Sequence, residues 1–105
     1  MNFRRPRGSK SQIERLRALT QYEFYHRFRD GQLSESDYFR AMTATEDDRV
    51  MRKVLRASSG PSSKLNGQQL NWEDIITWIA ENWQEILKIV LSIALLFADE
   101  ELQDG

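Results

Sequence analysis

The side chains that most often perform catalysis or hold metals are scarce in this sequence. Cysteine is absent, which excludes disulfides, cysteine-bound zinc, iron–sulfur clusters and a thiol nucleophile. The single histidine, His26, stands between Tyr25 and Arg27 with no acid or nucleophile partner visible, so it fits a helix surface better than a catalytic role. We therefore predict that the protein is not an enzyme and has no catalytic residues, no metal and no cofactor.

An acidic run at residues 46–48 also has a simpler explanation than ligand binding. Glu46, Asp47 and Asp48 could hold a cation, but no calcium-loop spacing follows them. Acidic side chains are favoured in the first turn of a helix, where they complement the positive end of the helix dipole. The run therefore predicts a helix start.

A basic segment opens the chain and is the one candidate site for a charged ligand. The predicted polyanion-binding residues are Arg4, Arg5, Arg7, Lys10, Arg15 and Arg17. Cations on such an arm can contact nucleic-acid phosphates and gain free energy from counterion release. Two alternatives stay open: a solvated tail, or a tail that docks on the acidic end of a neighbouring copy, at Asp99, Glu100, Glu101 and Asp104.

The net charge of −1 conceals a strong asymmetry along the chain. Residues 1–64 contain fourteen basic and eight acidic residues, a net of +6. Residues 65–105 contain one basic residue, Lys88, and eight acidic residues, a net of −7. This division of charge predicts either a polyanionic partner for the basic first half or head-to-tail attraction between copies of the chain.

Local signals divide the first half of the chain into an arm and a small helical unit. Residues 1–10, interrupted by Pro6 and Gly8, are predicted to form a flexible basic arm. Residues 11–57 are predicted to form three short helices packed as one unit. The predicted helix caps are Ser11 with Glu14, Ser34 with Asp37, and Thr43 or Thr45, with Gly31 as a left-handed stop.

The second half of the chain is dominated by one predicted helix. Residues 58–70 are rich in Ser, Gly, Pro and Asn and are predicted to form a linker. From Asn71, a plausible N-cap, no Gly or Pro interrupts residues 71–101, which predicts a helix about 45 Å long. Residues 102–105 form an acidic tail.

Apolar residues cover most of this helix, which indicates that it must be buried against something. Steps of three and four residues define a coiled-coil seam, the predicted oligomer interface: Trp72, Ile76, Ile79, Trp83, Ile86, Val90, Ile93 and Phe97. The flanks are apolar as well, at Ile75, Trp78, Leu87, Ile89, Leu91, Ala94, Leu95 and Leu96. A helix that is apolar nearly all round lies in a protein core or in a membrane.

Three partners for this helix remain open: the core of a monomer, other copies of the chain, or lipid. The uninterrupted apolar run, about ten residues, is too short to span a bilayer. A longer span would carry Glu81, Glu85 and Lys88 into the hydrocarbon, where they must face a bundle interior or a pore. The three tryptophans near its start resemble an interfacial belt, which keeps the membrane alternative open.

The sequence thus predicts an all-α fold with a compact N-terminal unit, a linker and one long apolar C-terminal helix suited to bundling. We predict a non-enzymatic interaction or assembly protein, in the cytoplasm or a virion. Its predicted partners are further copies of itself or a larger assembly, with nucleic acid a further candidate through the arm. The alternative is a small membrane protein with a single C-terminal transmembrane helix. The combination of a basic arm, capped helices and an apolar terminal helix resembles small phage or viral structural and accessory proteins.

Overall fold

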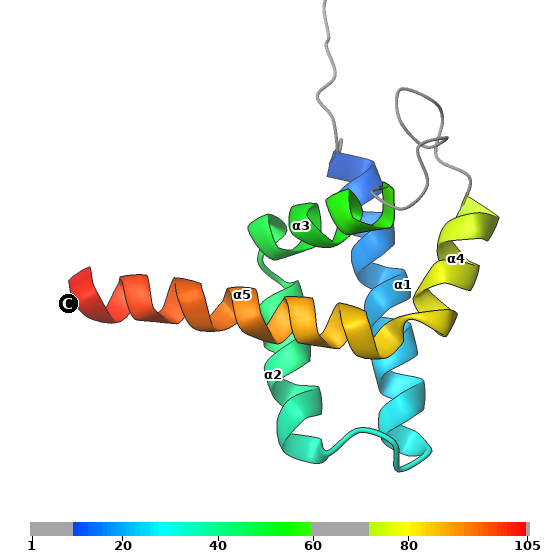
Figure 1. The fold of residues 1–105 in the computed structure, drawn as a ribbon, viewed down its shortest axis with the longest axis horizontal. Helices are drawn as coiled ribbons and strands as arrows, with labels where there is room; N and C mark the ends of the chain where they lie inside the picture. Colours follow the sequence, from blue (N-terminus) through cyan, green and yellow to red (C-terminus); the bar gives the residue numbers. More distant parts are fainter. Residues whose placement is uncertain (1–9, 60–71, 105) are drawn as a thin grey trace, which may run out of the picture.

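Five α-helices form the part of the chain that the computed structural model describes, residues 10–59 and 72–104 (Figure 1). Side chains are described for residues 10–57 and 72–96. The helices are α1 (Lys10–Arg29), α2 (Glu35–Thr45), α3 (Asp48–Ser59), α4 (Trp72–Glu81) and α5 (Trp83–Asp104). No strand occurs in these two ranges, so the predicted all-α class is confirmed. The predicted arm before Lys10 and the predicted linker beyond Ser59 lie outside the described residues.

The turn between α1 and α2 follows its predicted sequence signals. Gly31 adopts a φ of +80°, a left-handed conformation that glycine reaches without steric cost. The backbone N–H of Gln32 then donates to the Arg27 carbonyl oxygen over 2.8 Å, which closes the end of α1. Ser34 is the N-cap of α2, and its Oγ accepts a hydrogen bond from the Asp37 backbone N–H at 3.1 Å.

Two of the predicted helix caps are wrong. The helix α1 begins at Lys10, so Ser11 lies inside it, and the carboxylate of Glu14 pairs with Arg17 at 2.9 Å. The residue that caps the start of α3 is Asp47 and not a threonine. The Asp47 Oδ1 accepts a hydrogen bond from the Arg49 backbone N–H at 2.9 Å. An aspartate carboxylate is a strong N-cap acceptor, whereas Thr45 is the last residue of α2 and is fully buried.

The prediction of a single long C-terminal helix is also wrong, because the chain bends at Asn82 between α4 and α5. The Asn82 backbone N–H and its side-chain Nδ2 both donate to the Trp78 carbonyl oxygen, at 2.9 and 3.0 Å. The Asn82 carbonyl oxygen accepts from the Ile86 backbone N–H at 3.0 Å. Asparagine competes for backbone groups in this way and disfavours helix interiors. Asn82 therefore ends one helix and begins the next.

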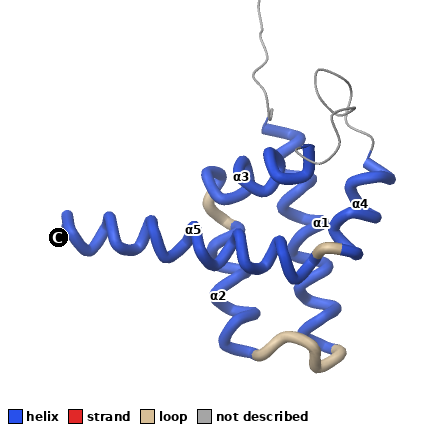
Figure 2. Tube along the Cα trace, viewed as in Figure 1, coloured by secondary structure: helices blue, strands red, loops and turns tan. Residues whose placement is uncertain are grey.

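All five helices contribute to one core, whose arrangement is clear in the tube view (Figure 2). The helices α1 and α2 pack against each other, α3 packs on α1 and α5, and α4 packs on α1. The fully buried core side chains include Ile13, Leu16, Phe24, Val50, Met51, Val54, Ile75, Ile86 and Val90. The bend at Asn82 allows α4 and α5 both to reach α1, which one straight rod could not do.

The last helix extends beyond this core. Its first half crosses the other helices, and its second half runs on past α2 and α3 to the C terminus (Figure 1). Across the two described ranges, no helix has both the length and the apolar content needed to cross a membrane.

Candidate interaction surface

The predicted coiled-coil seam lies mainly in the core of its own chain. Ile79, Trp83, Ile86 and Val90 are buried against the other helices, and Trp72 and Ile93 are half-buried. Ile76 alone among the described seam side chains is exposed, and the side chain of Phe97 lies outside the described set. The α1–α3 unit therefore supplies the partner for most of this seam.

The outer half of α5 is the part of the apolar helix that its own chain leaves uncovered. Leu95 and Leu96 are each 62% exposed, although they directly follow the half-buried Ile93 and Ala94. Both leucines belong to a flank that the sequence identified, whereas the predicted seam has one exposed side chain among those described, Ile76 of α4.

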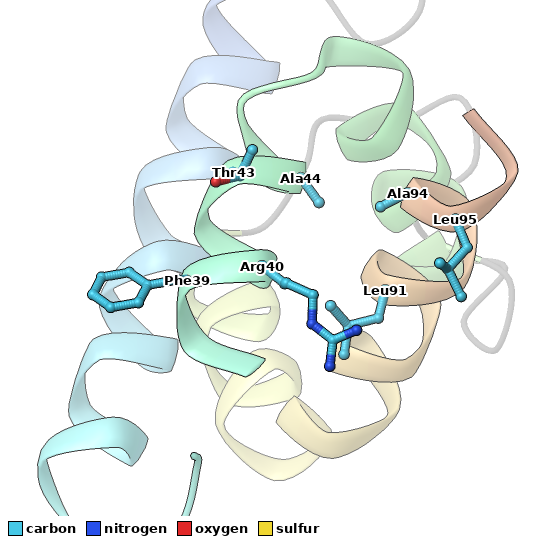
Figure 3. A pocket seen from close by; sticks show the side chains of 7 residues that line it. All are labelled: Phe39, Arg40, Thr43, Ala44, Leu91, Ala94 and Leu95. Carbon is cyan, nitrogen blue, oxygen red and sulfur yellow. The ribbon is translucent and has the colours of Figure 1, made fainter. Parts of the chain in front are cut away.

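A groove between α2 and α5 adjoins these leucines, with a volume of about 380 Å³. Its lining is largely apolar and comes from Phe39, Arg40, Thr43 and Ala44 of α2 and from Leu91, Ala94 and Leu95 of α5. Ala44 and Ala94 point toward one another across it (Figure 3). Because an alanine side chain ends at Cβ, Ala44 and Ala94 leave space between α2 and α5 at this point.

The charged member of the groove lining is Arg40. Its side chain reaches toward Leu91 in Figure 3 and is 60% exposed. One guanidinium nitrogen donates to Asp37 at 2.7 Å. Since a guanidinium carries five N–H donors, Arg40 keeps hydrogen-bonding capacity toward a carboxylate that reaches the groove.

Arg17 was predicted to bind a polyanion, but it is only 8% exposed and holds α1 against the α2–α3 turn. Its Nε donates to the Thr45 carbonyl oxygen at 2.7 Å, and its Nη2 donates to the Glu46 carbonyl oxygen and to Asp48. Burial alone lowers the pKa of Arg17, but hydrogen bonds to Asp48 and Glu14 outweigh that effect and raise it. Its donors are therefore committed within the fold.

The structure describes two of the other five predicted polyanion contacts. Lys10 and Arg15 are exposed on α1, and the Arg15 guanidinium lies 4.7 Å from the centre of a Trp72 ring. Arg4, Arg5 and Arg7 lie outside the described residues. The structure thus brings Arg15 to α4, and of the predicted set it describes only Lys10, Arg15 and Arg17.

The remaining candidate residues show no catalytic arrangement. His26 is exposed and stacks edge-on with Tyr22, with ring centroids 4.4 Å apart. Glu46 accepts a hydrogen bond from Gln21 at the end of α2, Asp47 pairs with Arg49, and Asp48 pairs with Arg17 in the first turn of α3. In the described ranges, no three His, Asp or Glu side chains gather in a way that could hold a metal ion.

Sequence reasoning identified Leu91, Ala94, Leu95 and Leu96 as an apolar flank but did not connect them with α2. No local sequence pattern could show this contact, because Arg40 and Ala44 lie more than 45 positions before these residues in the chain. A small residue on each helix, alanine in both cases, is the only local hint of the groove. Compared with known protein families, curated proteins and solved structures, the chain shows no match.

Proposed function

We propose that this protein is a non-enzymatic helical interaction protein that self-associates through the outer half of α5 and the groove beside it. The observation that carries the proposal is the exposure of Leu95 and Leu96 next to an apolar groove that their own helix lines. Single exposed apolar residues are ordinary on protein surfaces, whereas contiguous apolar patches mark interaction sites.

A second copy of the chain suits this surface because the surface supplies both a ridge and a groove. Leu95 and Leu96 form the ridge, and the side chains between α2 and α5 form the groove. In a twofold-symmetric pair with antiparallel α5 helices, the ridge of each copy enters the groove of the other. Every contact then occurs twice, as in the isologous interfaces of most homodimers.

Charge favours the antiparallel arrangement over a parallel one. The sequence of α5 ends with Asp99, Glu100, Glu101 and Asp104, whereas the charged residue of the groove is Arg40. An antiparallel pair brings the acidic end of one helix toward Arg40 of the other copy. A parallel pair would place the two acidic ends together, and like charges in an interface cost free energy.

The expected association is reversible. Complete burial of a leucine side chain stabilises by about 1.5–3 kcal/mol, and Leu95 and Leu96 are already partly covered. Association itself costs about 4–15 kcal/mol in translational and rotational freedom. The burial of four leucines per pair is therefore of the same order as this cost, and the net stabilisation of a dimer is small. We expect the dimer to dissociate on dilution.

The test is the mass of the full chain in detergent-free buffer, measured by sedimentation velocity over a concentration series. We expect the wild type to move from monomer to dimer and the variant Leu95→Glu/Leu96→Glu to remain monomeric. Tyr22→Glu is the matched control, because Tyr22 on α1 is also 62% exposed and lies outside the proposed surface. A wild type that stays monomeric at every concentration, or a double variant that dimerises like the control, would contradict the proposal.

A further inference from the structure

The helix α3 has two sharply different faces. Val50, Met51 and Val54 are fully buried against the rest of the chain. The opposite face carries four exposed cations at steps of three, one and three residues: Arg49, Arg52, Lys53 and Arg56. Because residues three and four apart are neighbours on a helix surface, these side chains form one continuous basic face.

The acidic side chains near this face already form ion pairs. Asp48 and Glu14 pair with Arg17, and Asp47 pairs with Arg49 at 2.8 Å. Within the described ranges, no acidic side chain forms an ion pair with Arg52 or Lys53. The positive charge in the middle of α3 is therefore not cancelled by the surrounding helices.

We propose that this basic face of α3, centred on Arg52 and Lys53, binds the phosphate backbone of a nucleic acid without reading its sequence. From Arg49 to Arg56 the helix rises about 10 Å. Phosphates of one DNA strand repeat about every 3.4 Å along the duplex axis, so the face is long enough to contact more than one phosphate. The planar guanidinium of Arg52 can bind phosphate oxygens in pairs, and Lys53 adds a second cation beside it.

The composition of the basic face favours a nucleic acid over a membrane surface as its partner. The apolar residues of α3 between the cations offer little surface to lipid, because Val50, Met51 and Val54 are buried and Leu55 is half-buried. The helix also has no aromatic residue for stacking on a base, which limits it to backbone contacts.

The helix α3 packs against α1, and its later turns lie beside the start of α1 in Figure 1. The chain enters α1 at Lys10, directly after the sequence that contains Arg4, Arg5 and Arg7. The proposal uses neither Leu95 nor Leu96, so it is independent of self-association.

The experiment measures fluorescence anisotropy of a labelled DNA duplex of scrambled sequence, titrated with the full chain at several salt concentrations. The test variant is Arg52→Gln/Lys53→Gln. The matched control, Arg29→Gln/Lys88→Gln, also removes one exposed arginine and one exposed lysine, from α1 and α5. We expect the test variant to bind about tenfold or more weakly and to lower the slope of log K against log salt by about 2.

Two results would overturn this proposal. One is equal weakening by the test and control variants, which would indicate a response to net charge alone. The other is a wild type that binds anionic phosphatidylserine vesicles or a poly-glutamate peptide but not the duplex. Helical circular dichroism of both double variants should match the wild type, since none of the four side chains is buried.

Discussion

Arg17 of α1 and Thr45 of α2 are joined by a 2.7 Å hydrogen bond from the Arg17 Nε to the Thr45 carbonyl oxygen. The bond matters because Thr45 is the last residue of α2, where helix carbonyl groups have lost their intrahelical donors. The same guanidinium also reaches Glu46 and Asp48. One side chain therefore secures the end of α2 and the start of α3 against α1.

Replacing Arg17 with methionine should lower the free energy of unfolding by about 1–3 kcal/mol. Methionine keeps the apolar stem but leaves the Thr45 carbonyl oxygen without its buried donor. Urea denaturation followed by circular dichroism measures the change. Arg29→Met is the control: Arg29 is exposed, and its removal should change stability by less than about 0.5 kcal/mol. Equal effects of the two variants would show that Arg17 does not secure the α2–α3 turn.

Replacing Thr20 with valine should stabilise the protein by about 1 kcal/mol. Thr20 is fully buried in α1, and its Oγ1 has no hydrogen-bond partner in the described part of the chain. A buried hydroxyl without a partner carries a desolvation cost, which a methyl group of similar shape removes. Thermal unfolding tests this prediction, with Thr77→Val on the exposed side of α4 as the control. A lower melting temperature for Thr20→Val would show that the hydroxyl is needed.

Asp47 should make part of the stability depend on acidic pH. Its side-chain hydrogen bond with Arg49, opposed by partial burial, holds the pKa of the Asp47 carboxyl below its usual value of 3.8. Because the folded pKa is lowered, this contribution is complete above pH 3.8 and is lost as the pH falls through the folded value. The variant Asp47→Asn should cost about 0.2–1 kcal/mol at neutral pH, through loss of the exposed ion pair.

Urea denaturation at neutral pH and at pH values below 3.8 measures this dependence. The difference in unfolding free energy between wild type and Asp47→Asn should shrink as the pH falls. Asp37→Asn, which removes the ion pair with Arg40 on α2, serves as a comparison for the general effect of losing one carboxylate. A difference that stays constant over the whole range would show that the ionised carboxylate of Asp47 adds nothing.

Sequence alone determined the features that depend on neighbouring residues. Gly31 as the stop of α1 and Ser34 as the cap of α2 were both predicted, because a positive φ and an N-cap hydrogen bond involve only a few adjacent positions. The burial of Ile13, Leu16 and Phe24 is of the same kind, since helical periodicity identifies which residues of a helix need burial.

Tertiary structure decided what those buried stripes pack against. Periodicity showed that Ile79, Ile86 and Val90 must leave water, but it could not distinguish a second copy from α1 to α3 of the same chain. The burial of Arg17 and the groove between Ala44 and Ala94 both depend on residues far apart in sequence meeting in space. Apolar burial is non-directional, so the sequence specifies the need for a partner and only the packed fold identifies it.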